Sequence, residues 1–111
     1  MENLFHRTSV RKYLDKPVEK KKILQILQAA MAAPSACNQQ PWRFTVVMDR
    51  ALIARLAATS PYATFAAEAP VLLVISYRKD CQLPEFAPVD TSAALENLWN
   101  EPDALGLGGV W

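Results

Sequence analysis

Cysteine, histidine and glycine are scarce in this 111-residue sequence, which has two cysteines, one histidine and three glycines. Cys37 and Cys81 form neither a CxxC pair nor a metal-binding spacing, so the simplest interpretation is a reduced, cytoplasmic setting. The single histidine and the dispersed acidic residues also lack the spacing of metal ligands. We therefore expect no metal site.

A large net charge is absent as well, because the formal charge at pH 7 is +1. Binding to nucleic acid would need a strongly basic face, so we expect no nucleic-acid partner. No apolar run reaches the roughly 18 residues of a membrane-spanning helix, and the longest extends only from Ala69 to Ser76. The first seven residues contain no apolar stretch typical of a secretion signal. We therefore expect no membrane partner.

The sequence does contain enough apolar residues to build a core. It is 51% hydrophobic and 21% charged, which is typical of a globular protein rather than a disordered one. A chain of this length predicts one domain covering residues 1–111.

The first half of the chain predicts a helix, a strand and a second helix. Residues 19–33 carry apolar side chains at helical spacing, and their alanines would allow another backbone to approach closely, within the subunit or across a dimer interface. Residues 42–47 are rich in β-branched and aromatic side chains and predict a strand. Asp49 is a suitable N-cap for a helix extending to Ala58. The apolar side chains that this helix would bury are Leu52, Ile53 and Leu56.

The second half predicts one more strand and a final helix. Residues 71–75 form a continuous apolar run, as expected for a strand covered on both faces. Asp90 is a good N-cap for the helix, and Pro102 predicts a kink or an early end near Asn100. Residues 105–111 then predict a turn into another strand. Their glycines follow a helix rather than a strand, which excludes a dinucleotide-binding fingerprint.

The most distinctive stretch, Pro34–Trp42, joins the first predicted helix to the first strand. Prolines near both ends prevent either element from continuing through it, and it holds one hydroxyl, one thiol and three carboxamides. Carboxamides carry donors and acceptors, so such a loop suits a heteroaromatic ring with mixed edges. A capped helix end followed by an ordinary turn explains the same composition, and on spacing alone it is slightly the better interpretation.

A second candidate site is the sequence Arg7-Thr8-Ser9-Val10-Arg11. The two arginines are four residues apart, so on a helical turn both guanidinium groups would lie on one face, beside two hydroxyls. Guanidinium groups bind phosphate oxygens in a bidentate manner, and the pattern fits a phosphate clamp. Taken alone, it is more simply explained as a solvated basic helix start.

As a set, these segments resemble the flavin-dependent nitroreductase family. Four pieces carry the resemblance in the family's order and span nearly the whole chain. They are Arg7–Arg11, Ala33–Trp42, Ala69–Pro70 with the apolar run that follows, and Asp90–Leu98 with Ala104–Gly108. The first piece is weak by itself, whereas the second is quite specific.

The resemblance implies an α+β fold with a mixed β-sheet flanked by helices, in an intertwined homodimer with two FMN sites at its interface. In the family, an Arg-x-Ser-x-Arg motif holds the flavin phosphate and ring edge, which implies Arg7, Ser9 and Arg11 here, with Thr8 as a further candidate. A Pro-Ser-x-x-Asn-x-Gln segment of the neighbouring subunit lies against the isoalloxazine ring. Its counterparts here are Pro34, Ser35, Ala36, Asn38 and Gln40.

The resemblance also implies an NAD(P)H oxidoreductase. NAD(P)H would reduce the flavin, and a nitro-aromatic, quinone or related small-molecule acceptor would take its place and be reduced. The protein would supply binding, orientation and electrostatics, so we name no catalytic acid, base or nucleophile. Cys37 has no resolving cysteine nearby in sequence and is better explained as a small packing residue.

The sequence departs from the family pattern in two places. It stops at Trp111, where nitroreductases usually continue with the rest of a strand and a C-terminal segment, so we expect the domain to be incomplete there. An incomplete copy of a longer enzyme and a natural short form are both compatible with this. Residues 101–103 also interrupt the usual alanine-rich helix with a proline. Two alternative functions remain open: a flavin-binding protein without turnover, and a cofactor-free dimerisation fragment.

Overall fold

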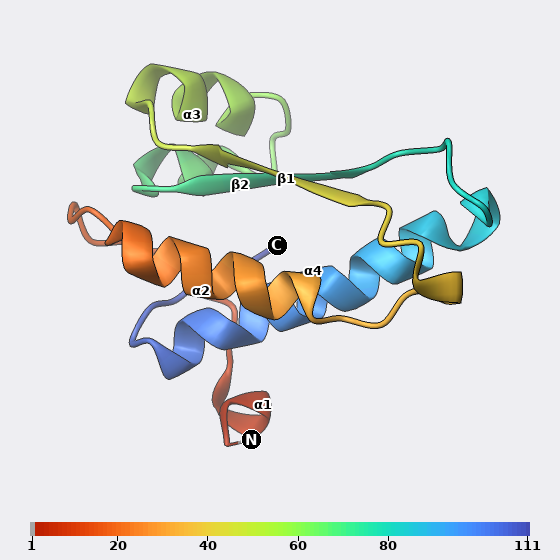
Figure 1. Ribbon diagram of the computed structural model, residues 1–111. Coiled ribbons are helices and arrows are strands. Elements are labelled where there is room, and N and C mark those ends of the chain that lie inside the picture. Colours follow the sequence, from red (N-terminus) through yellow and green to blue (C-terminus); the bar gives the residue numbers. More distant parts are fainter. Residues whose placement is uncertain (1) are drawn as a thin grey trace.

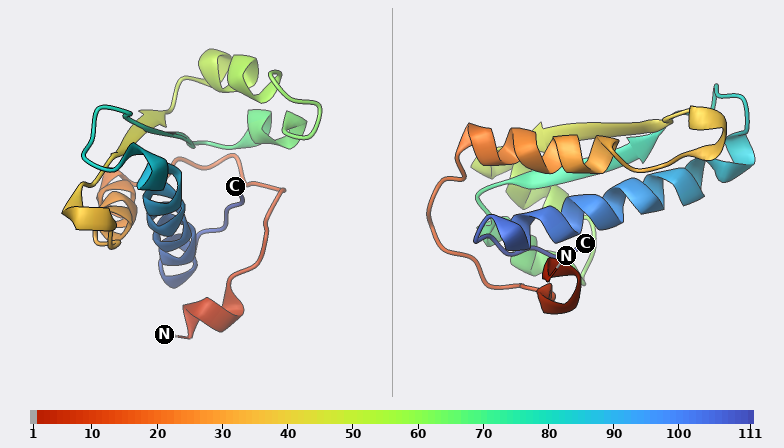
Figure 2. Two further views of the ribbon diagram at one scale, coloured as in Figure 1. Left: turned by 90° about the vertical axis from the view of Figure 1, so that its right-hand side faces the viewer. Right: turned by 60° about the horizontal axis from the view of Figure 1, so that its bottom comes forward.

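The computed structural model describes residues 2–111, which form a two-stranded sheet with helices on both sides (Figure 1). The elements are α1 (Asn3–His6), α2 (Lys20–Met31), η1 (Ala36–Asn38), β1 (Trp42–Val47), α3 (Arg50–Ala57), η2 (Thr64–Glu68), β2 (Leu72–Tyr77), η3 (Pro84–Phe86) and α4 (Ala87–Ala104). Helix α3 lies on one face of the sheet, and α2 and α4 lie on the other (Figures 1 and 2). The predicted α+β class is confirmed.

The two strands pair in antiparallel register, with Trp42 opposite Tyr77 and Val47 opposite Leu72. A single parallel bridge joins Ser9 to Gly109 outside this sheet. The predicted strand at residues 42–47 is therefore confirmed residue for residue, whereas residues 105–111 contribute one bridge rather than a strand.

The main core lies where α2 and α4 pack against each other and beneath the sheet. Its buried members are Ile26, Ala30, Ala33, Trp42, Ala94 and Leu98. Ala30 and Ala94 are fully buried, which shows that small side chains let the two helices approach closely within one chain. Asn97 donates a hydrogen bond of 3.0 Å from Nδ2 to the carbonyl of Ala29 and ties the same two helices together.

The predicted role of Asp90 as an N-cap is wrong, because α4 begins earlier, at Ala87. Pro88 stands in the first turn, where its missing N–H removes no intrahelical hydrogen bond and its fixed φ suits a helix. Asp90 is therefore a helical residue of the first turn, and its side chain is available for contacts outside the helix.

The predicted helix end near Asn100 is also wrong, because α4 continues through Pro102 to Ala104. The proline lies in the last turn, so only a short length of helix follows the missing N–H. Gly106 has a φ of 75°, a left-handed conformation suited to glycine. There the chain turns back, and the Leu107 N–H donates to the carbonyl of Pro102 at 2.8 Å.

Two burial predictions also need correction. Asp49 caps α3 by accepting from the Ala51 N–H at 3.3 Å, as predicted, but Leu52 is 38% exposed while Ile53 is fully buried. The apolar run of β2 is only half-buried, because it borders an open cavity instead of being covered on both faces. Within residues 2–111, no helix is long and apolar enough to cross a membrane.

Candidate functional site

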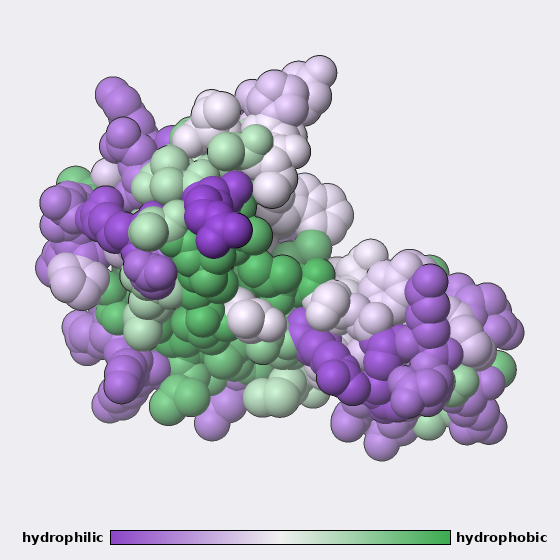
Figure 3. Space-filling model, turned by 90° about the horizontal axis from the view of Figure 1, so that it is seen from above, coloured by the Kyte–Doolittle hydropathy of each residue, from purple (hydrophilic) through white to green (hydrophobic). Residues whose placement is uncertain are grey.

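The first predicted site segment, residues 35–40, forms a compact loop that we call the amide loop. It contains the turn η1, in which the Asn38 N–H donates to the Ser35 carbonyl at 3.0 Å and the Gln39 N–H donates to the Ala36 carbonyl at 3.0 Å. Figure 1 shows the loop at one end of the molecule, between the end of α2 and the start of β1. Viewed from above the sheet, that end is largely polar, whereas apolar side chains gather near the middle (Figure 3).

Three residues of the amide loop have left-handed backbone conformations, although none of them is glycine. The φ angles are 49° at Cys37, 51° at Asn38 and 46° at Gln40. Such a conformation costs of order 1–3 kcal/mol per residue and persists only where the surroundings hold it. Asparagine tolerates it best, because its short polar side chain can bond locally. Concentrated strain of this kind is typical of functional sites.

The loop presents two carboxamides on its surface. Asn38 and Gln40 are both exposed, and Gln40 Nε2 donates to Asn38 Oδ1 at 3.0 Å. The Ser35 hydroxyl oxygen accepts from the Gln40 N–H at 3.0 Å, so this hydroxyl helps to close the loop. Pro34 is exposed beside them, while Ala36 is half-buried. The arrangement leaves donors and acceptors available to a planar polar ligand.

The second predicted segment, residues 7–11, is called the arginine segment here. It is not helical, because α1 ends at His6, and the bridge from Ser9 to Gly109 holds it against the chain end that follows α4. The Val10 N–H donates to the Gly109 carbonyl at 3.0 Å. The condition that would place Arg7 and Arg11 on one helix face is therefore not met. Thr8 and Ser9 are both exposed.

Arg7 is stacked on an aromatic ring that the sequence did not identify as part of a site. Its guanidinium carbon lies 3.9 Å from the centroid of the Trp99 ring, a favourable cation–π geometry. Trp99 is held in turn by a hydrogen bond of 3.0 Å from its Nε1 to the Gly109 carbonyl, and it stacks on Trp111. The Nη1 atom of Arg7 is buried without a hydrogen-bond partner in the described part of the chain.

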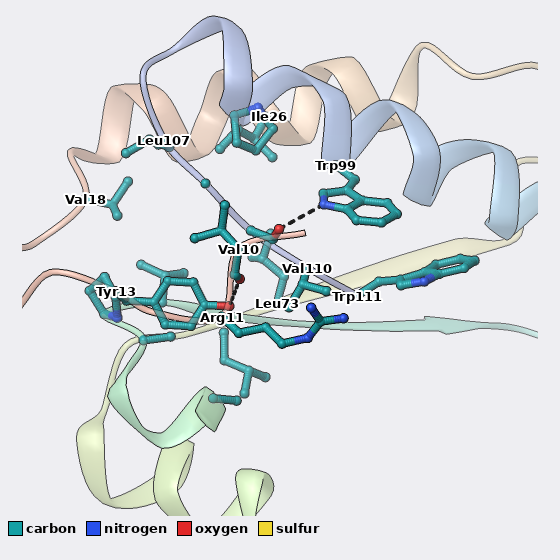
Figure 4. A pocket seen from close by; sticks show the side chains of 18 of the residues that line it. Val10, Arg11, Tyr13, Val18, Ile26, Leu73, Trp99, Leu107, Val110 and Trp111 are labelled. Atoms are coloured by element: carbon teal, nitrogen blue, oxygen red, sulfur yellow. Dashed lines mark hydrogen bonds between the residues drawn. The ribbon is translucent and has the colours of Figure 1, made fainter. Parts of the chain in front are cut away.

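Arg11 lines a wide, largely apolar cavity of about 950 Å³ (Figure 4). The cavity is bordered by the arginine segment, by β2 and by the residues that follow α4. Tyr13 also lines it and donates from its hydroxyl to the Val10 carbonyl at 2.6 Å. Burial raises the pKa of Tyr13 above its ordinary value of 10.0, while the charge of Arg11 acts in the opposite direction. The hydroxyl therefore remains a proton donor at neutral pH.

The electrostatics of the arginine segment favour an anion. The ion pairs between permanently charged groups among residues 2–111 join Lys22 to Glu19 and Arg50 to Asp15, and His6 forms a hydrogen bond with Asp103. Neither Arg7 nor Arg11 forms an ion pair with a carboxylate in this part of the chain. Two guanidinium groups near exposed hydroxyls are suited to phosphate oxygens.

Gly108 allows the residues after α4 to approach the arginine segment closely. A Cβ atom at this position would lie 2.8 Å from Val10 Cγ2 and 3.0 Å from Val10 Cβ. We expect Gly108→Ala to lower the free energy of unfolding by about 1–3 kcal/mol, since the β-branched valine cannot rotate away easily. Urea denaturation of the variant and the wild type measures this difference in the free energy of unfolding. Gly109→Ala is the matched control, because its Cβ would meet no atom within 4 Å. Equal stability of the two variants would contradict the prediction.

The structure does not bring the two predicted segments together. The amide loop lies at the end of α2 that leads into β1, whereas the arginine segment passes alongside the C-terminal half of α4, and all three ribbon views agree on this separation (Figures 1 and 2). One chain therefore presents two separate groups of predicted site residues.

Sequence reasoning missed three contacts around these segments. Trp99 supports Arg7, Asp90 bonds to the amide loop, and Arg78 donates from Nη2 to the Gln39 carbonyl at 2.7 Å. Each contact joins residues that are far apart in sequence, so no local pattern could have identified it.

The chain is similar to a protein-family model, to related sequences and to solved structures. Residues 4–60 match the sequence model of the Nitroreductase family. A protein of Methanothermobacter thermautotrophicus, provisionally named an NADH dehydrogenase/NAD(P)H nitroreductase, is 36% identical over 112 residues, which cover 100% of this chain and 59% of that protein. The chain therefore spans about three fifths of that relative's length.

Solved structures agree with this comparison. A protein of Clostridium acetobutylicum, provisionally named an NADH oxidase, is 42% identical with a TM-score of 0.93, covering 96% of this chain and 64% of its own. A protein of Clostridium difficile R20291, named an FMN-dependent nitroreductase, is 36% identical with a TM-score of 0.84, covering 96% of this chain and 61% of its own. The fold of this chain is therefore that of these proteins.

Proposed function

This chain belongs to the nitroreductase family, and from that premise we propose that it forms part of an FMN-dependent NAD(P)H oxidoreductase. Its acceptors would be nitro-aromatic compounds, quinones or related small molecules. We further propose that residues 1–111 act as a single domain and that two copies associate, with the flavin sites at their interface.

The observation that carries the proposal is the separation of two groups of site residues within one chain. The arginine segment offers guanidinium and hydroxyl groups, and the amide loop offers carboxamides, at different ends of the fold (Figures 1 and 2). A molecule with a phosphate at one end and a heteroaromatic ring at the other matches both groups only if a second copy supplies one of them. FMN is such a molecule.

The residues present fit FMN in their chemistry. Arg7, whose Nη1 has no partner among residues 2–111, and Arg11 would bind the phosphate and ring edge, with Thr8 and Ser9 adding hydroxyl donors. From the other subunit, Asn38 and Gln40 would hydrogen-bond to the donors and acceptors of the ring. Beside these two carboxamides, the residues that would lie against the ring are Pro34, Ser35 and Ala36.

The chemistry that FMN supplies when bound is two-electron transfer between a reduced nicotinamide and an acceptor. The tasks of this chain are to bind and orient the cofactor and to place positive charge beside it. Arg11 would stabilise negative charge on a reduced ring, since it lines the cavity without a carboxylate partner among the described residues. No acid or base of this chain is needed as a catalytic residue.

The direct test is a visible absorption spectrum of the purified chain after gel filtration, with and without added FMN. Flavin bands that elute with a dimer support the proposal, and oxidation of NAD(P)H with an added acceptor then tests turnover. Bound FMN without turnover would indicate a flavin-binding protein. A colourless dimer in excess FMN would indicate a dimerisation fragment and would overturn the proposed function for this chain.

Arg11→Ala is expected to weaken FMN binding by roughly 1.5–3 kcal/mol, the value of a charge-assisted hydrogen bond. The dissociation constant would rise roughly 10- to 150-fold, which titration of flavin fluorescence measures. Arg55→Ala is the matched control, because it removes an exposed arginine from α3, away from both segments. Unchanged affinity of Arg11→Ala would remove Arg11 from the site.

A further inference from the structure

Asp90 is a buried carboxylate whose two oxygens both face the amide loop. It is 5% exposed in the first turn of α4. Its Oδ1 accepts from the Ala36 N–H at 2.9 Å, and its Oδ2 accepts from Gln39 Nε2 at 2.7 Å. No cation pairs with it among residues 2–111, so its charge is stabilised by N–H donors and by the N-terminal end of the helix.

Gln39 extends the same contact to the segment that precedes α4. Its Nε2 also donates to the Leu83 carbonyl at 2.9 Å, and its Oε1 accepts from the Leu83 N–H at 2.8 Å. Its side chain is therefore turned inward and bonded at both ends, whereas the neighbouring Asn38 and Gln40 are exposed. The inward residue anchors the loop, and the two outward residues are left for a ligand.

Arg78 holds the far side of the loop. Its Nη2 donates to the Gln39 carbonyl at 2.7 Å, and its backbone N–H donates to the Pro41 carbonyl at 3.0 Å. The left-handed residues Cys37, Asn38 and Gln40 thus lie between contacts that fix the loop from two sides.

We propose that Asp90 and Gln39 are positioning residues that hold the amide loop in its left-handed conformation, so that Asn38 and Gln40 face the ring of the bound flavin. This inference rests on the FMN function proposed above. Neither Asp90 nor the inward Gln39 side chain touches the cofactor. Without their contacts the loop would relax to less strained angles, and both exposed carboxamides would point elsewhere.

Asp90→Asn tests the proposal with little change in volume. In either orientation of the asparagine side chain, its amide nitrogen faces the N–H donor of Ala36 or of Gln39. One hydrogen bond is therefore lost, because two donors then face each other. We expect the dissociation constant for FMN to rise at least tenfold. We also expect the Asn38 and Gln39 amides to exchange hydrogen at least tenfold faster, while the amides of β1 and β2 keep their wild-type rates. A general loss of stability would accelerate exchange in the strands too.

A second substitution provides a rescue. Gln39→Glu alone places two carboxylates side by side and is expected to weaken FMN binding at least as much as Asp90→Asn. In the double variant, the asparagine amide can donate to the new glutamate, but this glutamate cannot donate to the Leu83 carbonyl as Gln39 Nε2 does. We therefore expect a partial rescue, in which the loss of affinity is clearly smaller than the sum of the two single losses. Losses that simply add would show that the two side chains do not act as a pair and would overturn the proposal.

Glu101→Gln is the matched control on the same helix. Glu101 Oε1 accepts from Gln25 Nε2 at 3.0 Å, another carboxylate–carboxamide bond, but on the exposed surface and away from the loop. We expect wild-type affinity and exchange rates in this variant. Wild-type affinity and loop exchange in Asp90→Asn would overturn the proposal. If the wild-type chain binds no FMN, the proposed function fails, and the exchange rates still decide whether the pair holds the loop.

Discussion

Replacement of Trp42 by alanine is expected to lower the free energy of unfolding by about 3–5 kcal/mol. Trp42 is 9% exposed at the first position of β1, and its side chain belongs to the core between the sheet, α2 and α4. The truncation removes a large apolar area and leaves a cavity that the surrounding helices cannot close completely. Urea denaturation followed by circular dichroism measures the change.

Phe5→Ala is the appropriate control for this prediction. Phe5 is 91% exposed on α1, so its removal is expected to change stability by no more than about 0.5 kcal/mol. Comparable losses in the two variants would show that Trp42 does not pack in the core. Because Trp42 directly follows the amide loop and Pro41, its packing also fixes where that loop leaves the core.

Trp42 illustrates which parts of the fold could be predicted from the sequence. The strand Trp42–Val47 was predicted from neighbouring residues alone, because β-branched and aromatic side chains favour it locally. Helix α2 followed from apolar spacing, and the capping contact of Asp49 followed from its position before α3. These features depend on contacts between residues close in sequence, and local patterns identify them reliably.

The errors concern residues whose role is set by distant contacts. An aspartate before an apolar helix can cap it or can lie inside it and bond elsewhere, and Asp90 does the latter, 54 residues away from Ala36. Pro102 predicts a kink or an early end near Asn100, but α4 continues to Ala104 although the proline removes one intrahelical N–H donor. Such decisions depend on tertiary packing, which overrides local preference.

In the candidate site, too, local patterns identified residues but not the contacts between distant parts of the chain. The sequence identified both segments by residue type, but it could not show that they lie at different ends of one chain. Nor could it show that Arg7 rests on Trp99, because the two residues are far apart in sequence and no local pattern distinguishes Trp99 as part of a site. The family resemblance already implies a site shared between two copies, and the separation of the two segments within one chain supports that proposal.

Removing both arginines of the arginine segment should have the largest effect on cofactor binding. For the double variant Arg7→Ala and Arg11→Ala we expect a loss of about 3–6 kcal/mol in FMN affinity, if each makes an independent charge-assisted bond. The protein should then elute without flavin bands even from solutions with excess FMN. Loss of the Arg7–Trp99 contact also removes about 0.5–2 kcal/mol of stability, so thermal unfolding must be measured alongside.

Two further double variants separate charge from geometry. Arg43→Ala with Arg55→Ala removes the same charge from exposed positions on β1 and α3, and we expect it to leave affinity within about threefold of the wild type, since exposed charges are screened by salt. Arg7→Lys with Arg11→Lys keeps both charges but loses the planar fork, and it should bind FMN with intermediate affinity. If the variant with Arg7→Ala and Arg11→Ala bound FMN as the wild type does, the phosphate could not lie at the arginine segment. If the lysine variant equalled the wild type, charge alone would hold the phosphate, and the bidentate contact would be excluded.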